Sequence, residues 1–136
     1  MIDKHVTSLE VSKRLAELGV KRGSYFVHGE TNLGLATTSR AVANEAVDAE
    51  ILKIIAPAYL ASELGEMLPD SIQGDEVEMH FGINKEDEFG IWYCSFNRCN
   101  NPSLGKPIIN ADTMPDAMGK MLVWLIKNGH MEAGDA

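Results

Sequence analysis

The sequence predicts an α+β fold, in which a mainly antiparallel sheet (two hairpins plus a short C-terminal strand) is packed by N-terminal, middle and C-terminal helices. Three observations lead to this prediction. Helix-capping residues and helically spaced apolar residues occur near both ends of the chain, and residues 76–83 alternate apolar and polar side chains with the period of a strand. The helical segments are also short and apolar on one side, so each needs a sheet to cover. At 136 residues the chain is long enough for one core, and we predict a single domain over residues 1–136.

The first predicted helix begins at Thr7. Thr7 and Glu10 have the spacing of a capping box, in which each side chain accepts a hydrogen bond from the other residue's backbone N–H. Apolar residues then recur at helical spacing over residues 11–18, and Gly19 follows where a left-handed residue commonly ends a helix. This helix is expected to cover a sheet.

The next predicted elements are the two strands of a hairpin, residues 24–28 and residues 33–38. The turn-forming residues 29–32 separate them. Both faces of this hairpin carry apolar side chains, which indicates that it is central in a sheet or covered on both sides.

The segment from residue 38 to residue 56 predicts no definite structure. Residues 41–49 are compatible with a helix, and residues 51–55 are compatible with either a strand or a helix. Pro57 is expected to end whatever element precedes it. Beyond it, apolar residues at helical spacing predict the middle helix over residues 58–68, which the following proline ends.

The second hairpin combines residues 76–83 with residues 89–96, on either side of the polar turn Lys85-Glu86-Asp87-Glu88. A turn at this position sets the register. The predicted opposite pairs are Val77 and Phe96, Met79 and Cys94, Phe81 and Trp92, and His80 and Tyr93. One face of the hairpin is then almost entirely apolar, and the helices are expected to lie on it.

The last predicted elements are a short strand over residues 107–111 and a C-terminal helix. Thr113 and Asp116 mark the start of this helix, since a Thr hydroxyl there can accept from a backbone N–H and an Asp carboxylate favours the positive end of the helix dipole. Pro115 is tolerated in the first turn, and Gly129 follows the last turn, where a left-handed residue is favoured.

The charge of the chain is concentrated in one segment. The formal net charge is −8, and residues 61–90, with nine acidic residues and one basic residue, account for all of it. Because proteins bind nucleic acids mainly through Lys and Arg, we expect no direct contact with DNA or RNA. No apolar run approaches the roughly 20 residues of a membrane span. No signal peptide precedes the first helix, so we expect a cytoplasmic protein without a membrane partner.

The sequence contains no recognisable catalytic motif. It has no phosphate-binding Gly-rich loop, no Gly-x-Ser-x-Gly and no His-Glu-x-x-His, and the four histidines lie outside any motif. Cys94 and Cys99 lack the further ligands that a metal site needs and are interpreted as ordinary thiols. The pair Glu63 and Glu66 and the acidic turn at residues 86–88 are interpreted as solvated surface. We therefore expect a non-enzymatic protein with no cofactor, metal site or catalytic residue.

One polar group is placed by the hairpin geometry. In the predicted register His80 lies opposite Tyr93, with Glu78 nearby, on the hairpin face that the helices leave open. These three residues are the candidate partner or ligand face, although cross-strand His–Tyr pairs also occur on plain solvated sheets.

Three segments of the chain, Thr7 to Leu15, Tyr59 to Pro69 and Ala111 to Gly129, follow one another in an order that resembles small phage- and prophage-encoded proteins of unknown function. Residues 38–56 have no counterpart in those proteins. The three segments carry helix caps and packing residues. The resemblance therefore implies a shared fold and a phage accessory role, and it transfers no catalytic residue.

Three functions are compatible with these observations. The leading hypothesis is an accessory protein of phage or prophage type that acts by binding a host or phage protein, with homo-oligomers formed through a sheet edge or the open sheet face as a further interpretation. The first alternative is an acidic mimic of nucleic acid, which inhibits a host DNA-binding protein through residues 61–90. The second alternative is a small ligand-binding protein or enzyme that uses Glu78, His80 and Tyr93.

Overall fold

The computed structural model describes residues 2–73, 78–86, 90–97 and 107–136, with residues 73, 78 and 97 described by their backbone alone. This part of the chain forms four α-helices and two antiparallel sheets, so the predicted α+β class is confirmed. In chain order the elements are η1 (Ile2–Lys4), α1 (Leu9–Glu17), β1 (Phe26–Thr31), β2 (Gly34–Ser39), α2 (Arg40–Asp48), β3 (Lys53–Ala58), α3 (Ala61–Met67), β4 (Ser71–Gln73), β5 (Glu78–Glu86), β6 (Ile91–Asn97), β7 (Ile108–Ala111), α4 (Met114–Lys127) and η3 (Ala133–Asp135).

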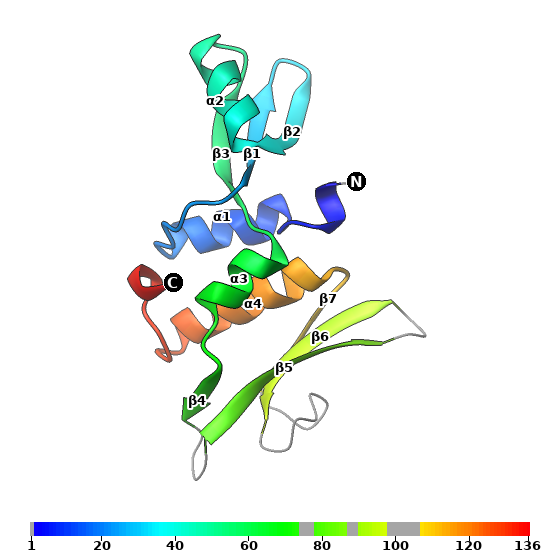
Figure 1. Ribbon diagram of the computed structural model, residues 1–136, viewed down its shortest axis with the longest axis vertical. Helices are drawn as coiled ribbons and strands as arrows, with labels where there is room; N and C mark the ends of the chain where they lie inside the picture. The colour runs from blue at the N-terminus through cyan, green and yellow to red at the C-terminus, as the bar shows by residue number, and fades with distance from the viewer. Residues whose placement is uncertain (1, 74–77, 87–89, 98–106) are drawn as a thin grey trace.

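The two predicted hairpins lie in two different sheets, so the expectation of one shared sheet is wrong. The first hairpin contributes β1 and β2 to a three-stranded sheet of order β2-β1-β3, and the second contributes β5 and β6 to a four-stranded sheet of order β4-β5-β6-β7. The two hairpins are separated because residues 38–56, for which the sequence predicted no definite structure, fold as α2 and most of β3. These elements give the first hairpin a third strand and a covering helix. Figure 1 shows this unit, here named the small lobe (residues 26–58), at one end of an elongated molecule.

The small lobe has its own core. Two of its residues, Gly29 and Pro57, lie in other elements than the sequence predicted. Buried Val27 and Leu52 lie in this core. Gly29, predicted in the turn, lies inside β1, where a Cβ would come within 2.6 Å of Leu52 Cδ1. Pro57 does not end β3 but lies within it, opposite Val27. A proline is tolerated there because β3 is an edge strand, on which a missing N–H need not remove a ladder hydrogen bond.

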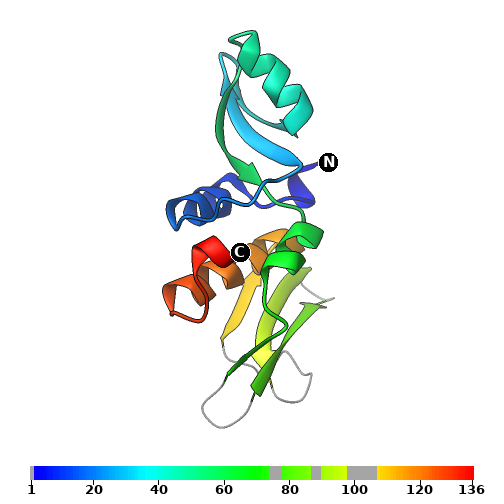
Figure 2. The same ribbon diagram turned by 60° about the vertical axis from the view of Figure 1, so that its left-hand side comes forward.

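In the rest of the molecule, here named the main body, α4 is the central element. It lies directly on β6 and β7, and both α1 and α3 pack against it. Figures 1 and 2 show α1 on the far side of α4 from the four-stranded sheet, so that α4 rather than α1 covers this sheet. Gly119 lies at the contact between the two helices, where a Cβ would come within 2.6 Å of Val11 Cγ1.

The second hairpin keeps its predicted faces but not its predicted register. Phe81 lies opposite Phe96, four residues along β6 from its predicted partner, because β5 runs on through Glu86 into the predicted turn. Val77, predicted opposite Phe96, lies outside the described residues. A shift by an even number of residues leaves each side chain on the same face. The side chains packed on the core are therefore the predicted ones, Met79, Phe81, Ile83 and Trp92.

The ends of α4 are as predicted, whereas the start of α1 is not. Thr113 Oγ1 accepts from the backbone N–H of Asp116 at 3.3 Å, and Gly129 has a φ of 75°. At α1 the capping residue is Ser8, whose Oγ accepts from the Val11 N–H at 3.4 Å, and the helix begins with the residue that follows it.

Thr7 does not cap α1 because its side chain and its backbone N–H bind Tyr59, the residue that directly follows the small lobe. Its Oγ1 accepts from the Tyr59 N–H at 3.0 Å and lies 2.7 Å from Ser12 Oγ, and its own N–H donates to the Tyr59 carbonyl at 2.9 Å. In the same region Asp116 Oδ1 accepts from the Ser8 N–H at 2.7 Å, which fixes the start of α1 to the start of α4. The Thr7–Glu10 capping box is thus replaced by tertiary hydrogen bonds.

Candidate functional site

The predicted face of Glu78, His80 and Tyr93 is spread along the sheet. Tyr93 lies opposite Asn84, whose side-chain nitrogen donates to the Tyr93 hydroxyl at 3.2 Å, while His80 pairs four positions further along β6. The predicted pairing of His80 with Tyr93 is therefore wrong, and about 13 Å of strand separates the two positions. Glu78 lies opposite Gln73 of β4. That this face binds a partner or a ligand stays a prediction.

Two acids of the 61–90 segment bind other residues of the chain. Glu63 accepts from the Leu60 N–H at 2.8 Å and from the Tyr25 N–H at 3.0 Å, so it caps α3 and holds the chain that leads into the small lobe. Glu66 forms an ion pair with Arg22. Both carboxylates thus already have partners within the chain, although the Glu66 side chain remains exposed. Four further acids of the segment, Asp75, Glu76, Asp87 and Glu88, lie outside the described residues, so the nucleic-acid mimic stays a prediction.

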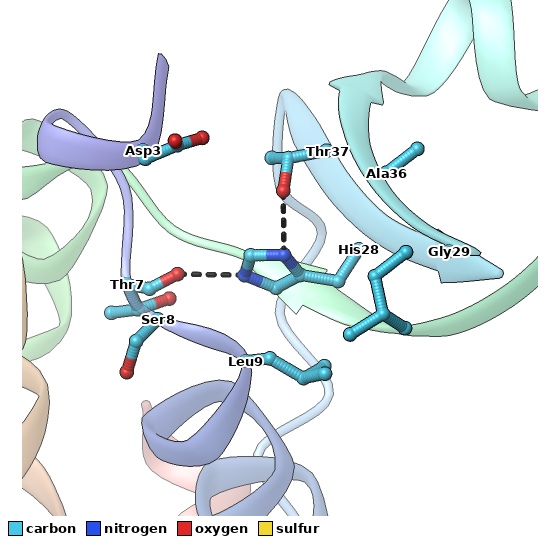
Figure 3. A pocket seen from close by; sticks show the side chains of 9 residues that line it. Asp3, Thr7, Ser8, Leu9, His28, Gly29, Ala36 and Thr37 are labelled. Atoms are coloured by element: carbon cyan, nitrogen blue, oxygen red, sulfur yellow. Dashed lines mark hydrogen bonds between the residues drawn. The ribbon is translucent and has the colours of Figure 1, made fainter. Parts of the chain in front are cut away.

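His28 of β1 lies beside a pocket of about 300 Å³ and is bound at both ring nitrogens (Figure 3). Nε2 is 2.7 Å from the Thr7 carbonyl oxygen, and Nδ1 is 2.9 Å from Thr37 Oγ1. Because a carbonyl oxygen can only accept, Nε2 carries a proton and donates it to the Thr7 carbonyl, while Nδ1 shares a hydrogen bond with the Thr37 hydroxyl. With 8% of its surface exposed, the ring joins β1 and β2 to the segment before α1, which is a structural role.

Cys94 is a buried, unreactive thiol. Its Sγ donates to the Ala117 carbonyl at 3.3 Å, and burial raises the pKa of the thiol to about 12. It therefore stays protonated at neutral pH and is a poor nucleophile and metal ligand. Cys99 lies outside the described residues.

Within residues 2–73, 78–86, 90–97 and 107–136, no three His, Cys, Asp or Glu side chains gather closely enough to hold a metal ion. Each helix found in those ranges is too short or too polar to cross a lipid bilayer.

A groove of about 390 Å³ lies between β7, the C-terminal half of α4 and α1, and we name it the β7 groove. Two distant parts of the sequence form it, α1 near the start of the chain and β7 with α4 near its end. Its lining residues are Arg14 of α1, Ile108, Ile109 and Asn110 of β7, and Lys120, Val123, Trp124, Lys127 and Asn128 at α4.

The β7 groove is basic in a chain whose net charge is −8. Arg14, Lys120 and Lys127 line it, and none of the described lining residues is acidic. Glu10 and Glu17 lie one turn of α1 to either side of Arg14, but they do not line the groove. The three basic side chains are exposed, so their charges are accessible to a carboxylate on a partner.

The β7 groove follows the outer edge of the four-stranded sheet. Ile109 packs on the core, whereas Ile108 and Asn110 are exposed on the other face of β7, yet all three line the groove. Successive side chains point to opposite faces of a strand. A groove lined by three successive residues of β7 therefore runs along the edge of this strand. β7 pairs with β6 on its inner side, and among the described strands none pairs with its outer side.

A larger pocket, of about 510 Å³, lies where the N-terminal segment meets the start of α4 and the end of β5. Lys4, Lys85 and Asp112 line it, and Lys85 Nζ lies 5.7 Å from the centroid of the Trp92 ring. Asp112 offsets one of the positive charges, and Lys85 already has the Trp92 ring as a partner. This pocket therefore selects less clearly for one sign of charge than the β7 groove does.

One part of the β7 groove is visible in the sequence as a pattern of residue spacing. Lys120, Val123, Trp124 and Lys127 have the i, i+3, i+4, i+7 spacing of one helix face, and Lys127 also suits the negative end of the helix. Arg14 and β7 approach this face only in the folded chain, so the groove itself has no local sequence pattern.

No known protein family, curated protein or solved structure matches this chain. The resemblance to phage-encoded proteins stays a prediction. The function is therefore inferred from the geometry and charge of the site.

Proposed function

We propose that this protein is a non-enzymatic binding protein that takes up an extended, acidic segment of a partner protein along the β7 groove. The observation that carries the proposal is the coincidence of an outer strand edge with three basic side chains in a strongly acidic chain. A partner from a phage or its host is the expectation that the sequence resemblance adds.

The groove offers such a segment three kinds of contact. A peptide that adds to β7 as a further strand gains backbone hydrogen bonds that do not depend on its sequence. Its aliphatic side chains can pack beside Ile108 on one face of the sheet, while its carboxylates, on the other face, approach Lys120 and Lys127 of α4. Each exposed ion pair contributes about 0.2–1 kcal/mol, so the charges select the segment and the other two contacts supply most of the affinity.

Fluorescence anisotropy with labelled synthetic peptides tests the proposal. The probe is Gly-Val-Glu-Ile-Glu-Val-Gly, one matched peptide replaces both Glu by Lys, and another is methylated on alternate backbone nitrogens so that it cannot pair with a strand. We expect the probe to bind and both matched peptides to bind at least about tenfold more weakly. Equal binding of the Lys peptide would overturn the proposal, because the basic side chains would then not select the ligand.

Charge reversal in the protein places the binding on the groove. Lys120→Glu combined with Lys127→Glu should weaken binding of the probe about tenfold, which corresponds to about 1.4 kcal/mol over the two exposed positions. The matched control reverses Lys13 and Lys21, which are exposed, lie outside the groove and change the net charge equally. If both double variants weaken binding to the same extent, the net charge of the protein rather than the groove controls binding, and the proposal fails.

A further inference from the structure

The Trp124 ring, which lines the β7 groove, is stacked with the ring of His130. The two ring centroids are 5.0 Å apart and the ring planes are inclined by 17°. Trp124 is part of the lining of the groove, whereas His130 is not. The imidazole therefore lies one ring away from the surface that the proposed acidic segment contacts.

The end of α4 holds His130 in this position. Gly129 has a φ of 75°, the left-handed conformation that often follows the last turn of a helix. The Gly129 N–H donates to the Ile126 carbonyl at 3.3 Å, and the His130 N–H donates to the Leu125 carbonyl at 3.0 Å, as in a Schellman motif. Because these backbone hydrogen bonds fix the residue, the place of the imidazole does not depend on the ring contact alone.

The imidazole of His130 can take up a proton without breaking a hydrogen bond. The residue is exposed, and in the described part of the chain its ring forms no hydrogen bond or ion pair. Histidine is the side chain whose charge ordinarily changes between about pH 5 and pH 8. Since a cation is attracted to the face of an indole ring, protonation should keep the imidazole on Trp124 rather than expel it.

The elements around the end of α4 carry charges of both signs. They contribute Lys120 and Lys127 of α4, Glu10, Lys13, Arg14 and Glu17 of α1, and Glu132 and Asp135 at η3. Of these, Arg14, Lys120 and Lys127 line the β7 groove and none of the acids does. An acidic ligand in the groove therefore meets the basic members of this set.

We infer that protonation of His130 strengthens the binding of an acidic segment in the β7 groove, an inference that rests on the function proposed above for this groove. The imidazolium raises the number of positive charges beside the ligand from three to four. It acts through space, because the Trp124 ring lies between it and the groove, and it makes the affinity of the groove dependent on pH.

Fluorescence anisotropy with the labelled probe peptide at about pH 8 and about pH 5.5 tests the inference. An ionic strength of about 0.01 M, with a Debye length of about 30 Å, keeps the charges unscreened over this range. Glutamate ordinarily ionises near pH 4.3, so the probe keeps its charge at both pH values. The unaltered protein should bind the probe about two- to fivefold more tightly at the lower pH, which is the gain expected from one exposed charge.

Two matched substitutions assign this gain to one residue. His130→Phe keeps a ring for Trp124 but cannot take up a proton, so it should bind the probe as the unaltered protein does at about pH 8 and lose the gain at about pH 5.5. His5→Phe is the control, since His5 is exposed and lines another pocket, and this variant should keep the whole gain. NMR signals of the His130 imidazole should shift over the same pH range as the affinity.

A gain that persists in His130→Phe, or that both variants lose equally, overturns the inference. The same holds if the affinity changes over a pH range in which the His130 signals do not move. The double variant Lys120→Glu with Lys127→Glu separates these results from failure of the peptide site. If it weakens binding while the gain persists in His130→Phe, the groove stands and its dependence on His130 falls. If the probe binds at neither pH, the proposed function falls as well.

Discussion

Gly65 and Gly119 provide a pair of positions at which the same substitution should have opposite effects on stability. Both lie within helices, α3 and α4, where alanine is favoured over glycine by about 1 kcal/mol. A Cβ at position 65 would lie 3.8 Å from Met118 Cε, which is an ordinary contact. A Cβ at position 119 would lie 2.6 Å from Val11 Cγ1 and 3.1 Å from Thr7 Cγ2.

These distances set the expected magnitudes. Gly65→Ala should raise the free energy of unfolding by about 0.5–1 kcal/mol through helix propensity alone. At Gly119 the new methyl group would lie about 1 Å inside the optimal carbon–carbon separation, and the β-branched Val11 has little rotamer freedom in a helix with which to move away. Overpacking typically costs about 1–3 kcal/mol, and the upper end of that range less the gain in propensity predicts a loss of about 2 kcal/mol.

Urea denaturation followed by tryptophan fluorescence measures both effects. The transition midpoint should rise for Gly65→Ala and fall for Gly119→Ala, with the denaturant dependence unchanged in each. In a double-mutant cycle, Val11→Ala and Gly119→Ala together should cost less than the sum of their separate costs, because the first change removes the methyl group that the second one meets. A Gly119→Ala protein as stable as the unaltered chain would refute the close approach of α1 and α4.

Three further predictions use the same unfolding assay or a thiol reagent. His28→Leu removes two hydrogen bonds of a buried ring and should lower the free energy of unfolding by about 2 kcal/mol, and an unchanged value would contradict the structural role of the ring. Thr113→Ala removes the cap of α4 and should cost about 1 kcal/mol, whereas no loss would show that the cap is not needed. In a Cys99→Ser background, Cys94 should react with a thiol reagent only as fast as the chain opens, because its raised pKa of about 12 keeps it protonated. The unfolded thiol ionises at lower pH than the folded one, so the stability that this group contributes should fall as the pH rises from about 9 towards 12, and rapid labelling of the folded chain would contradict the burial of Cys94.

The ends of the helices are largely predictable from the sequence because a cap involves residues only a few positions apart. Thr113 and Gly129 mark the two ends of α4 as predicted. The start of α1 is the exception, since Thr7 and Ser8 are both good capping residues. Ser8 caps the helix because Tyr59, more than fifty residues away, hydrogen-bonds the Thr7 side chain, and no local pattern contains that contact.

The second hairpin shows how far strand periodicity reaches. Alternation with a period of two assigns each side chain to a face, and it did so correctly for Phe81 and Trp92. It does not set the register, because any shift by an even number of residues satisfies the same alternation. The predicted pairing of His80 with Tyr93 depended on the register and was therefore wrong, although both residues lie on the face opposite the core.

The candidate site depends still less on local pattern. His28 looks unremarkable in the sequence, and its two hydrogen bonds come from a neighbouring strand and from the segment before α1. The β7 groove takes Arg14 from near the start of the chain and its remaining residues from near the end. Only the four residues of α4 on one helix face could have been grouped from their spacing.

By itself, the sequence determined the α+β class, the positions of most helices and strands, and the apolar face of the second hairpin, because caps and periodicity act within a few residues. Only the tertiary structure decided that the hairpins belong to two sheets, which residues lie opposite each other, and that a basic groove forms along β7 in an acidic protein. These features arise from contacts between residues far apart in the chain, and they depend on how the elements pack rather than on the pattern within any one of them.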